Sequence, residues 1–111
     1  MQDIQSVIDQ MISYILTQAA RLDQVRVQMF LRWLKSHSIA VRNAEQNLIE
    51  VDARNKEQIN NDLKNSLKIW FESLPVLGLL WEYHMILGEI NWWRRLDERS
   101  LARILKADDH D

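Results

Sequence analysis

Residues 74–93 read LPVLGLLWEYHMILGEINWW, and this stretch constrains how the rest of the chain can be arranged. Pro75 presets the backbone for the first turn of a helix and disfavours helix in the residue before it, so we predict that a helix begins there. The only charged side chains in the stretch are Glu82 and Glu89. Apolar or aromatic residues therefore surround the predicted helix on nearly every side.

A helix that is apolar on all sides is central in its bundle, spans a membrane or is buried in an oligomer. Residues 74–93 also contain two Glu, one His, one Asn and two Gly, and this polar content disfavours a membrane span. We therefore expect no membrane contact, and a helix that is covered either by its own bundle or by another subunit.

The chain before this stretch contains neither Gly nor Pro, which tight turns between strands require. We therefore predict an all-α fold class. Between Asp3 and about Ser36, apolar residues recur in steps of three and four, which predicts one helix of roughly 50 Å. The predicted stripe consists of Ile4, Ile8, Met11, Ile15, Ala19, Leu22, Val25, Met29 and Trp33, widened by Val7, Ile12, Leu16, Phe30 and Leu34.

A second long helix is predicted to end at about Ser73, and two starting points stay open for it. Hydroxyl groups near Ser36 and Ser38 can cap a helix, and Asn43 followed by Gln46 resembles a capping box. Its apolar seam is narrow, which is typical of one arm of an antiparallel, coiled-coil-like hairpin. The seam runs through Val41, Ala44, Leu48 and Val51 and then, past Asn55, through Ile59, Leu63, Leu67, Trp70 and Leu74.

The end of the chain predicts a short terminal helix over residues 98–106, with Asp97 as its N-cap. The predicted architecture is a small helical bundle. It comprises a long antiparallel hairpin, an apolar third helix and a short C-terminal helix. We expect one domain over residues 1–107 and an acidic tail over residues 108–111.

Composition narrows the function classes. Of the 111 residues, 47% are hydrophobic and 27% are charged, as in a globular protein, and the net charge of −2 gives no overall attraction to nucleic acid or anionic membrane. There is no Cys, which excludes a disulfide scaffold and a thiolate zinc site. The first residues lack the basic and apolar segments of a secretory signal, so we expect a cytoplasmic protein.

Two groups of residues invite a catalytic interpretation. Glu82 and His84 are about 200° apart around a helix, which disfavours a shared metal ion, so we expect Glu82 and Glu89 to bind Arg or Lys from a neighbouring helix.

Arg32 and His37, with four residues between them, resemble the Arg…His pair of HEPN-type ribonucleases, which implies a nuclease site at these residues. Trp33, directly after the Arg, departs from the usual polar residue of that motif. We favour a His at the negative end of a helix dipole, and predict no enzyme activity, metal or cofactor.

The most informative group is Trp92-Trp93, because neighbours on a helix point about 100° apart and cannot both face one core. A short chain with five Trp is difficult to reconcile with burial of all of them, so we predict a protein-binding surface and a homo-oligomer. The function would be that of an adaptor, a chaperone-like subunit, an inhibitor or another assembly component. The predicted contact residues are Trp81, Trp92, Trp93, Arg94 and Arg95, followed by Trp70 and Trp33.

The alternative function is that of a small helical subunit in a ribonucleoprotein or defence complex. The chain is similar in size and helical content to the small subunits of CRISPR effector complexes. Basic side chains next to aromatics can follow a phosphate backbone and stack on bases, whereas the competing interpretation is a solvated helix face. The candidate nucleic-acid contacts are Arg21, Arg32, Arg42, Arg94, Arg95, Arg99 and Arg103.

Overall fold

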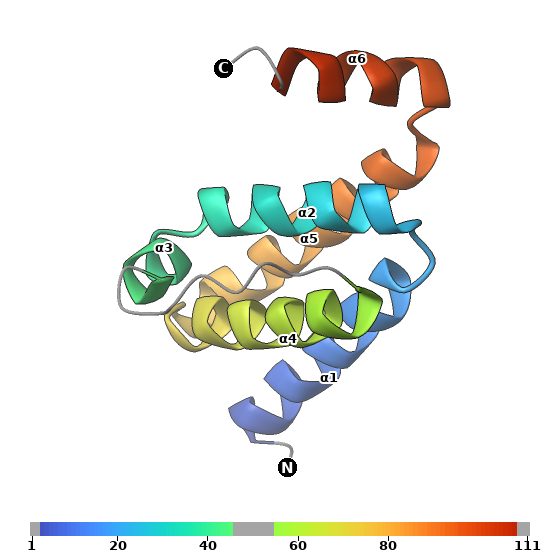
Figure 1. The fold of residues 1–111 in the computed structure, drawn as a ribbon. Helices are drawn as coiled ribbons and strands as arrows, with labels where there is room; N and C mark the ends of the chain where they lie inside the picture. Colours follow the sequence, from blue (N-terminus) through green and yellow to red (C-terminus); the bar gives the residue numbers. More distant parts are fainter. Residues whose placement is uncertain (1–2, 46–54, 109–111) are drawn as a thin grey trace.

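The computed structural model describes residues 3–45 and 55–108, and over these ranges the chain forms six α-helices and no strand (Figure 1). This confirms the predicted all-α class and small helical bundle. The last three residues of the predicted acidic tail lie outside the described residues. The helices are α1 (Ile4–Ala19), α2 (Gln24–His37), α3 (Ile39–Glu45), α4 (Lys56–Glu72), α5 (Val76–Arg95) and α6 (Glu98–Asp108).

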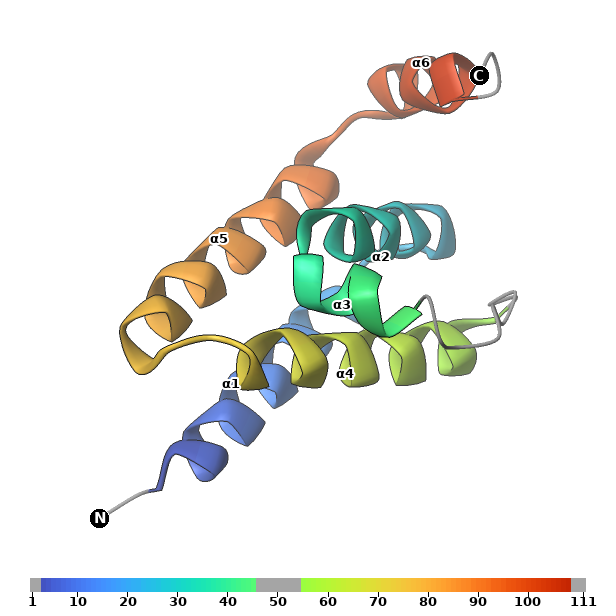
Figure 2. The same ribbon diagram turned by 90° about the vertical axis from the view of Figure 1, so that its left-hand side faces the viewer.

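Four helices form the body of the molecule. Helices α1 and α2 each pack against both α4 and α5, and the short α3 packs against α2 and α4. Figure 2 shows α5 along one edge of this body, with no helix on its outer side. Helix α6 lies beyond the end of α5 and projects away from α1 and α4 (Figures 1 and 2).

The single helix predicted over residues 3–36 is interrupted at residues 20–23, where the chain turns a corner between α1 and α2. Ala20 keeps a right-handed helical conformation at the end of α1, and Asp23 is extended. The Asp23 carboxylate accepts a hydrogen bond of 2.9 Å from the backbone N–H of Arg26 and so caps α2. The prediction was wrong here because this corner needs no positive φ, so any residue type can form it.

The corner also changes which face of the second segment is buried. The predicted stripe places Val25, Met29 and Trp33 inward, but Val25 is exposed and the other two are only half-buried. The side chains that α2 buries in the core are Val27, Phe30, Leu31 and Leu34. A stripe extrapolated across a corner loses its register because the second helix starts in a new direction.

The second break confirms one of the two predicted positions. Helix α2 ends at His37, and the Ser38 hydroxyl accepts a 3.2 Å hydrogen bond from the backbone N–H of Val41 at the start of α3. Asn43 lies inside α3 and starts no helix. The predicted continuous helix to Ser73 is also divided, because α3 ends at Glu45 and α4 begins only at Lys56. The predicted seam residues Leu48 and Val51 lie outside the described residues.

Local capping rules give the remaining boundaries. Asn55 caps α4 by accepting a 2.9 Å hydrogen bond from the Gln58 N–H, and Asp97 caps α6 by accepting one of 2.7 Å from the Ser100 N–H. Pro75 directly precedes α5, as predicted. No helix within the described ranges is long and apolar enough to cross a membrane.

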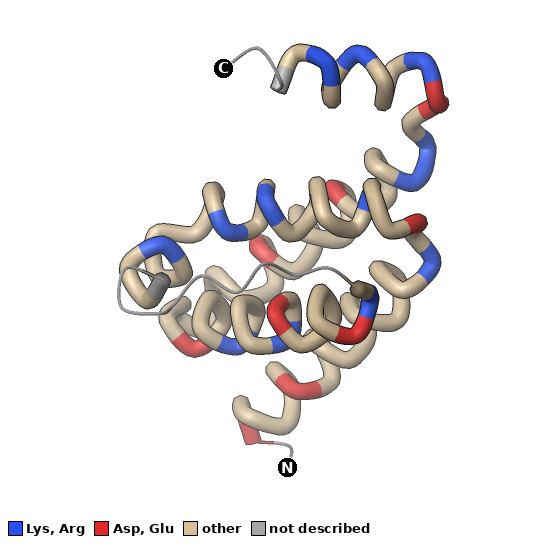
Figure 3. The backbone as a smooth tube through the Cα atoms, viewed as in Figure 1, with Lys and Arg blue, Asp and Glu red and all other residues tan. Residues whose placement is uncertain are grey.

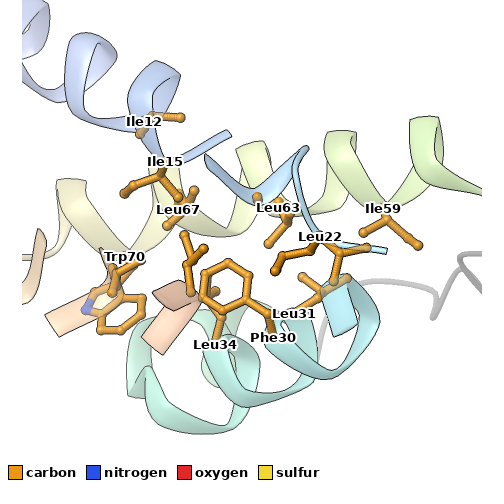
Figure 4. Close-up of a cluster of buried hydrophobic side chains, with 14 of the residues drawn as sticks. Ile12, Ile15, Leu22, Phe30, Leu31, Leu34, Ile59, Leu63, Leu67 and Trp70 are labelled. Carbon is orange, nitrogen blue, oxygen red and sulfur yellow. The ribbon is translucent and has the colours of Figure 1, made fainter. Parts of the chain in front are cut away.

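The core lies where α1, α2 and α4 meet, and α5 extends it on one side. Figure 4 shows side chains of these three helices converging on Phe30 and Leu63. The predicted seam residues of α4 (Ile59, Leu63, Leu67 and Trp70) are all buried, which confirms that part of the pattern.

Arg26 links the corner to the far end of the chain. The residue is only 8% exposed, and its Nε donates a 3.0 Å hydrogen bond to the Trp93 carbonyl in the last turn of α5. Its Nη2 donates to the Leu96 carbonyl at 2.6 Å and to the Glu98 carboxylate at 3.1 Å. Its Nη1 pairs with Asp23. We call these contacts the Arg26 clamp; they fix the end of α5 and the start of α6 to the start of α2.

Replacing Arg26 with Met keeps an apolar stem of similar length but removes every donor of the clamp. We expect Arg26→Met to lower the free energy of unfolding by about 2–3 kcal/mol, because two backbone carbonyls lose a charged donor. The carboxylates of Asp23 and Glu98 can regain water, which limits the loss. Urea unfolding followed by circular dichroism measures it. Arg21→Met, at an exposed position of the same corner, is the control, and equal stability of the two variants would contradict this role.

Candidate functional site

Helix α5 has one buried face and one exposed face. Its buried side chains are Leu79, Ile86, Ile90 and Trp93, which pack towards α1 and α2. None of the six described helices covers the opposite face (Figure 2). The sequence left open whether α5 is central in its bundle, and the structure places it at the edge.

The exposed face forms a continuous row that we call the outer stripe. It is defined by Leu77, Trp81, His84, Gly88, Trp92 and Arg95, all of them exposed. The steps of three and four residues place these positions on one side of the helix. The outer stripe therefore extends along almost the full length of α5.

The first half of the outer stripe is strongly apolar. Leu77 is 94% exposed and Trp81 is 76% exposed, and Val76 and Leu80 beside them are also exposed. We call these four residues the apolar patch. Adjacent large apolar side chains on the surface of a small protein are a mark of an interaction site.

The five predicted contact residues divide between surface and core. Trp81, Arg94 and Arg95 are exposed and Trp92 is 48% exposed, whereas Trp93 is 5% exposed and belongs to the core. The Trp92 and Trp93 rings meet edge to face, with 4.8 Å between their centroids. The expected division of this pair between two faces is confirmed, and Trp93 is not available to a partner in this fold.

The other two predicted contact residues, Trp70 and Trp33, contribute to the interior. Trp70 is buried and Trp33 is half-buried, and both contact the His37 ring, with centroids 5.7 Å and 5.0 Å away from it. His37 is the last residue of α2, as expected for a histidine at the negative end of a helix dipole. Arg32 and His37 are five positions apart and therefore about 140° apart around α2. This geometry does not bring the two side chains to one face.

The seven candidate arginines do not form one surface. Figure 3 shows basic residues along α6 and the end of α5, where Arg94, Arg95, Arg99 and Arg103 are all exposed. The Arg26 clamp brings the corner, which carries Arg21, to the same end of the molecule. Arg42 lies on α3 beyond the opposite end of α2, roughly 20 Å away along that helix. Arg32 lies on α2 between these two ends.

Glu82 and Glu89 do not form the ion pairs with Arg or Lys that the sequence predicted. The ion pairs that the structure describes join Arg26 to Asp23 and Glu98, and Lys35 to Asp62, so neither glutamate pairs with Arg or Lys among the described residues. Oε2 of Glu82 is buried and has no hydrogen-bond partner within the described part of the chain.

The carboxylate of Glu89 lies near the buried Trp93 and the exposed His37. Burial raises its pKa above the usual 4.5. The Trp93 indole N–H, which approaches without reaching hydrogen-bond geometry, and the charge of His37 offset part of this rise. Over the described ranges, no group of three His, Asp or Glu side chains is placed to hold a metal ion.

An open cavity of about 310 Å³ lies where the α1–α2 corner meets the start of α4. Its lining is mostly apolar and includes Leu22, Val27 and Leu63, with Lys56 and Glu57 among the lining residues. This cavity lies at the corner and is not part of the outer stripe.

The raised pKa of Glu89 predicts a pH dependence of stability. The folded state binds the Glu89 proton more tightly than the unfolded state does. The stability that this proton contributes is therefore present below pH 4.5 and is lost as the pH rises through the pKa of Glu89 in the folded state. We therefore expect Glu89→Gln to be more stable than wild type at neutral pH and to lose this advantage in acid. Urea unfolding at several pH values tests it. Asp9→Asn, at an exposed position, is the control, and an equal pH response of the two variants would contradict the assignment.

No family model, curated protein or solved structure matches this chain. The geometry of α5 and α6 is therefore the basis for a functional proposal.

Proposed function

We propose that this protein is a non-enzymatic assembly subunit that binds another protein surface through the outer stripe of α5. The observation that supports this most is the apolar patch, where Leu77 and Trp81 are 94% and 76% exposed. Transferring a side chain such as Leu from water to an apolar contact is worth roughly 1.5–3 kcal/mol. A protein partner supplies such a contact and explains why α5 is apolar on both faces.

The residues around the apolar patch also suit a protein interface. Trp and Arg are enriched among the residues that dominate binding energy, and Trp81, Trp92 and Arg95 all lie on the outer stripe. Polar groups outside the apolar patch, such as His84 and Asn91, would give the contact its specificity.

The proposal predicts that binding depends on the apolar patch and not on the fold in general. We expect affinity capture from the native cells to retain at least one protein with the wild-type chain and to lose it with Leu77→Glu/Trp81→Glu. Both positions are exposed, so the variant keeps its helical circular dichroism.

Ile39→Glu provides a matched control, because Ile39 is a large aliphatic side chain that is 66% exposed on α3, away from the outer stripe. We expect this variant to retain the same protein as wild type. If no captured protein distinguishes the double variant from this control, the proposal is wrong.

A second candidate function is binding to single-stranded nucleic acid at the end of α5 and along α6. The observation in its favour is the group of four exposed arginines, Arg94, Arg95, Arg99 and Arg103, close to the partly exposed Trp92. Arg94 also donates a 2.8 Å hydrogen bond to Asn91 on its own helix, and Asp97 and Glu98 lie between the arginines in the sequence. These acidic neighbours reduce the local positive potential.

The second candidate makes a distinct prediction about salt. Four phosphate contacts to a single strand give a slope of about −3 for the logarithm of the binding constant against the logarithm of the salt concentration. Fluorescence anisotropy with a labelled oligonucleotide measures this slope, and Arg99→Gln/Arg103→Gln would halve it. Absence of binding at low salt would eliminate this candidate and leave the protein interface unaffected.

A further inference from the structure

We propose that the occupant of the outer stripe is a second copy of this chain, with the two α5 helices packed antiparallel about a two-fold axis. The inference rests on the function proposed above and identifies its partner. The outer stripe runs from Leu77 to Arg95, about 27 Å along the helix. A second α5 has the same length and presents the same exposed row, so each copy can cover the other along its whole length.

Charge favours a second copy in the antiparallel orientation. Between Asp3 and Ala20, and again between Pro75 and Trp93, the chain carries two acidic residues and no Lys or Arg. Helices α1 and α5 pack together, and the side of the molecule that they form therefore carries no basic residue between these limits; Asp3 and Asp9 are exposed on it, whereas Glu82 and Glu89 are half-buried. The opposite sign is found where α5 ends, at the exposed Arg94 and Arg95.

An antiparallel pair therefore places the basic end of one α5 beside the acidic side of the other copy. Glu72, at the end of α4 and close in the chain to the first turn of α5, is exposed and would lie near Arg95 of the second copy. A parallel pair would instead bring both basic ends together, and like charges across an interface disfavour association. The helix dipoles also favour the antiparallel pair, because the positive end of each helix then lies beside the negative end of the other.

Gly88 provides the place where the two helices can approach each other. A Cβ built on Gly88 meets no atom within 4 Å, so the space beside it faces away from this chain's own core. With the two-fold axis level with Ile86, Gly88 lies opposite His84 of the second copy. The larger imidazole then fills the space that the missing side chain leaves.

The same register brings the aromatic residues of the two outer stripes close together. It places Trp92 of one copy beside Leu80 of the other, and so beside Trp81. Given their exposed fractions of 76% and 48%, Trp81 and Trp92 offer on the order of 250 Å² of surface. This is about a third of the roughly 800 Å² per partner that a specific interface buries, before the aliphatic residues of the apolar patch are added.

Light scattering after size-exclusion chromatography tests the occupant. We expect a dimer for the purified wild-type chain and a monomer with unchanged helical circular dichroism for Leu77→Glu/Trp81→Glu. Ile39→Glu should remain a dimer, because α3 is not part of the proposed contact. A wild-type chain that stays monomeric at roughly 100 μM would overturn the inference.

Orientation is tested by cross-linking, for which the absence of natural Cys gives a clean background. We expect a mixture of Leu77→Cys and Arg95→Cys chains to form, on mild oxidation, a disulfide that joins one chain of each variant. Leu77→Cys alone should form none. A disulfide between two Leu77→Cys chains would indicate parallel packing and overturn the proposed geometry.

Gly88→Leu tests the close approach independently of charge. Leu favours helix more than Gly does and meets no obstacle within this chain, so the thermal midpoint of the monomer should not fall. The dissociation constant of the dimer should rise at least tenfold, and an unchanged constant would contradict the crossing at Gly88. If the wild-type chain is monomeric but captures a different protein through the apolar patch, only the dimer is overturned. If the wild-type chain captures no protein at all, the proposed function is overturned.

Discussion

The structure depends on one buried cation, the Arg26 guanidinium. It lies in the first turn of α2 and donates to carbonyls that are 67 and 70 positions further along the chain. A positive charge is favourable near the C-terminal carbonyls of α5, and the Asp23 carboxylate is favourable at the N-terminus of α2. Burial raises the pKa of Asp23, but the hydrogen bonds from the Arg26 amide and guanidinium lower it by more. The pKa of Asp23 is therefore below its usual value. The two charges join three helix ends at one point.

This clamp explains why α5 presents its outer stripe. The last turn of α5 is held at Trp93 and Leu96, and its inner face is filled by Leu79, Ile86 and Ile90. Both constraints act from the side of α1 and α2, so the helix cannot turn its second apolar face towards the core. Exposure of Leu77 and Trp81 is thus a consequence of how the fold is fixed, and the function we propose uses it.

Sequence patterns succeeded where a local interaction sets the structure. Pro75 starts α5 and Asp97 caps α6 because each acts on backbone groups within one turn of itself. The pattern over residues 59–70 placed the core face of α4 correctly, since no break intervenes. The corner at residues 20–23 was missed because absence of Gly and Pro excludes only turns that need unusual φ values. This corner uses right-handed helical and extended conformations that any residue adopts.

By itself, the sequence determined that the protein is helical, that a new helix follows Pro75, and that Trp92 and Trp93 cannot share a face. Each of these follows from backbone sterics or from the angle between neighbours on a helix. Only the tertiary structure decided which side of α5 is buried, that Trp93 rather than Trp92 faces inward, and that Arg26 binds the end of α5. Periodicity cannot choose a face when a helix is apolar all round, and it carries no information about contacts between residues that are some seventy positions apart in the chain.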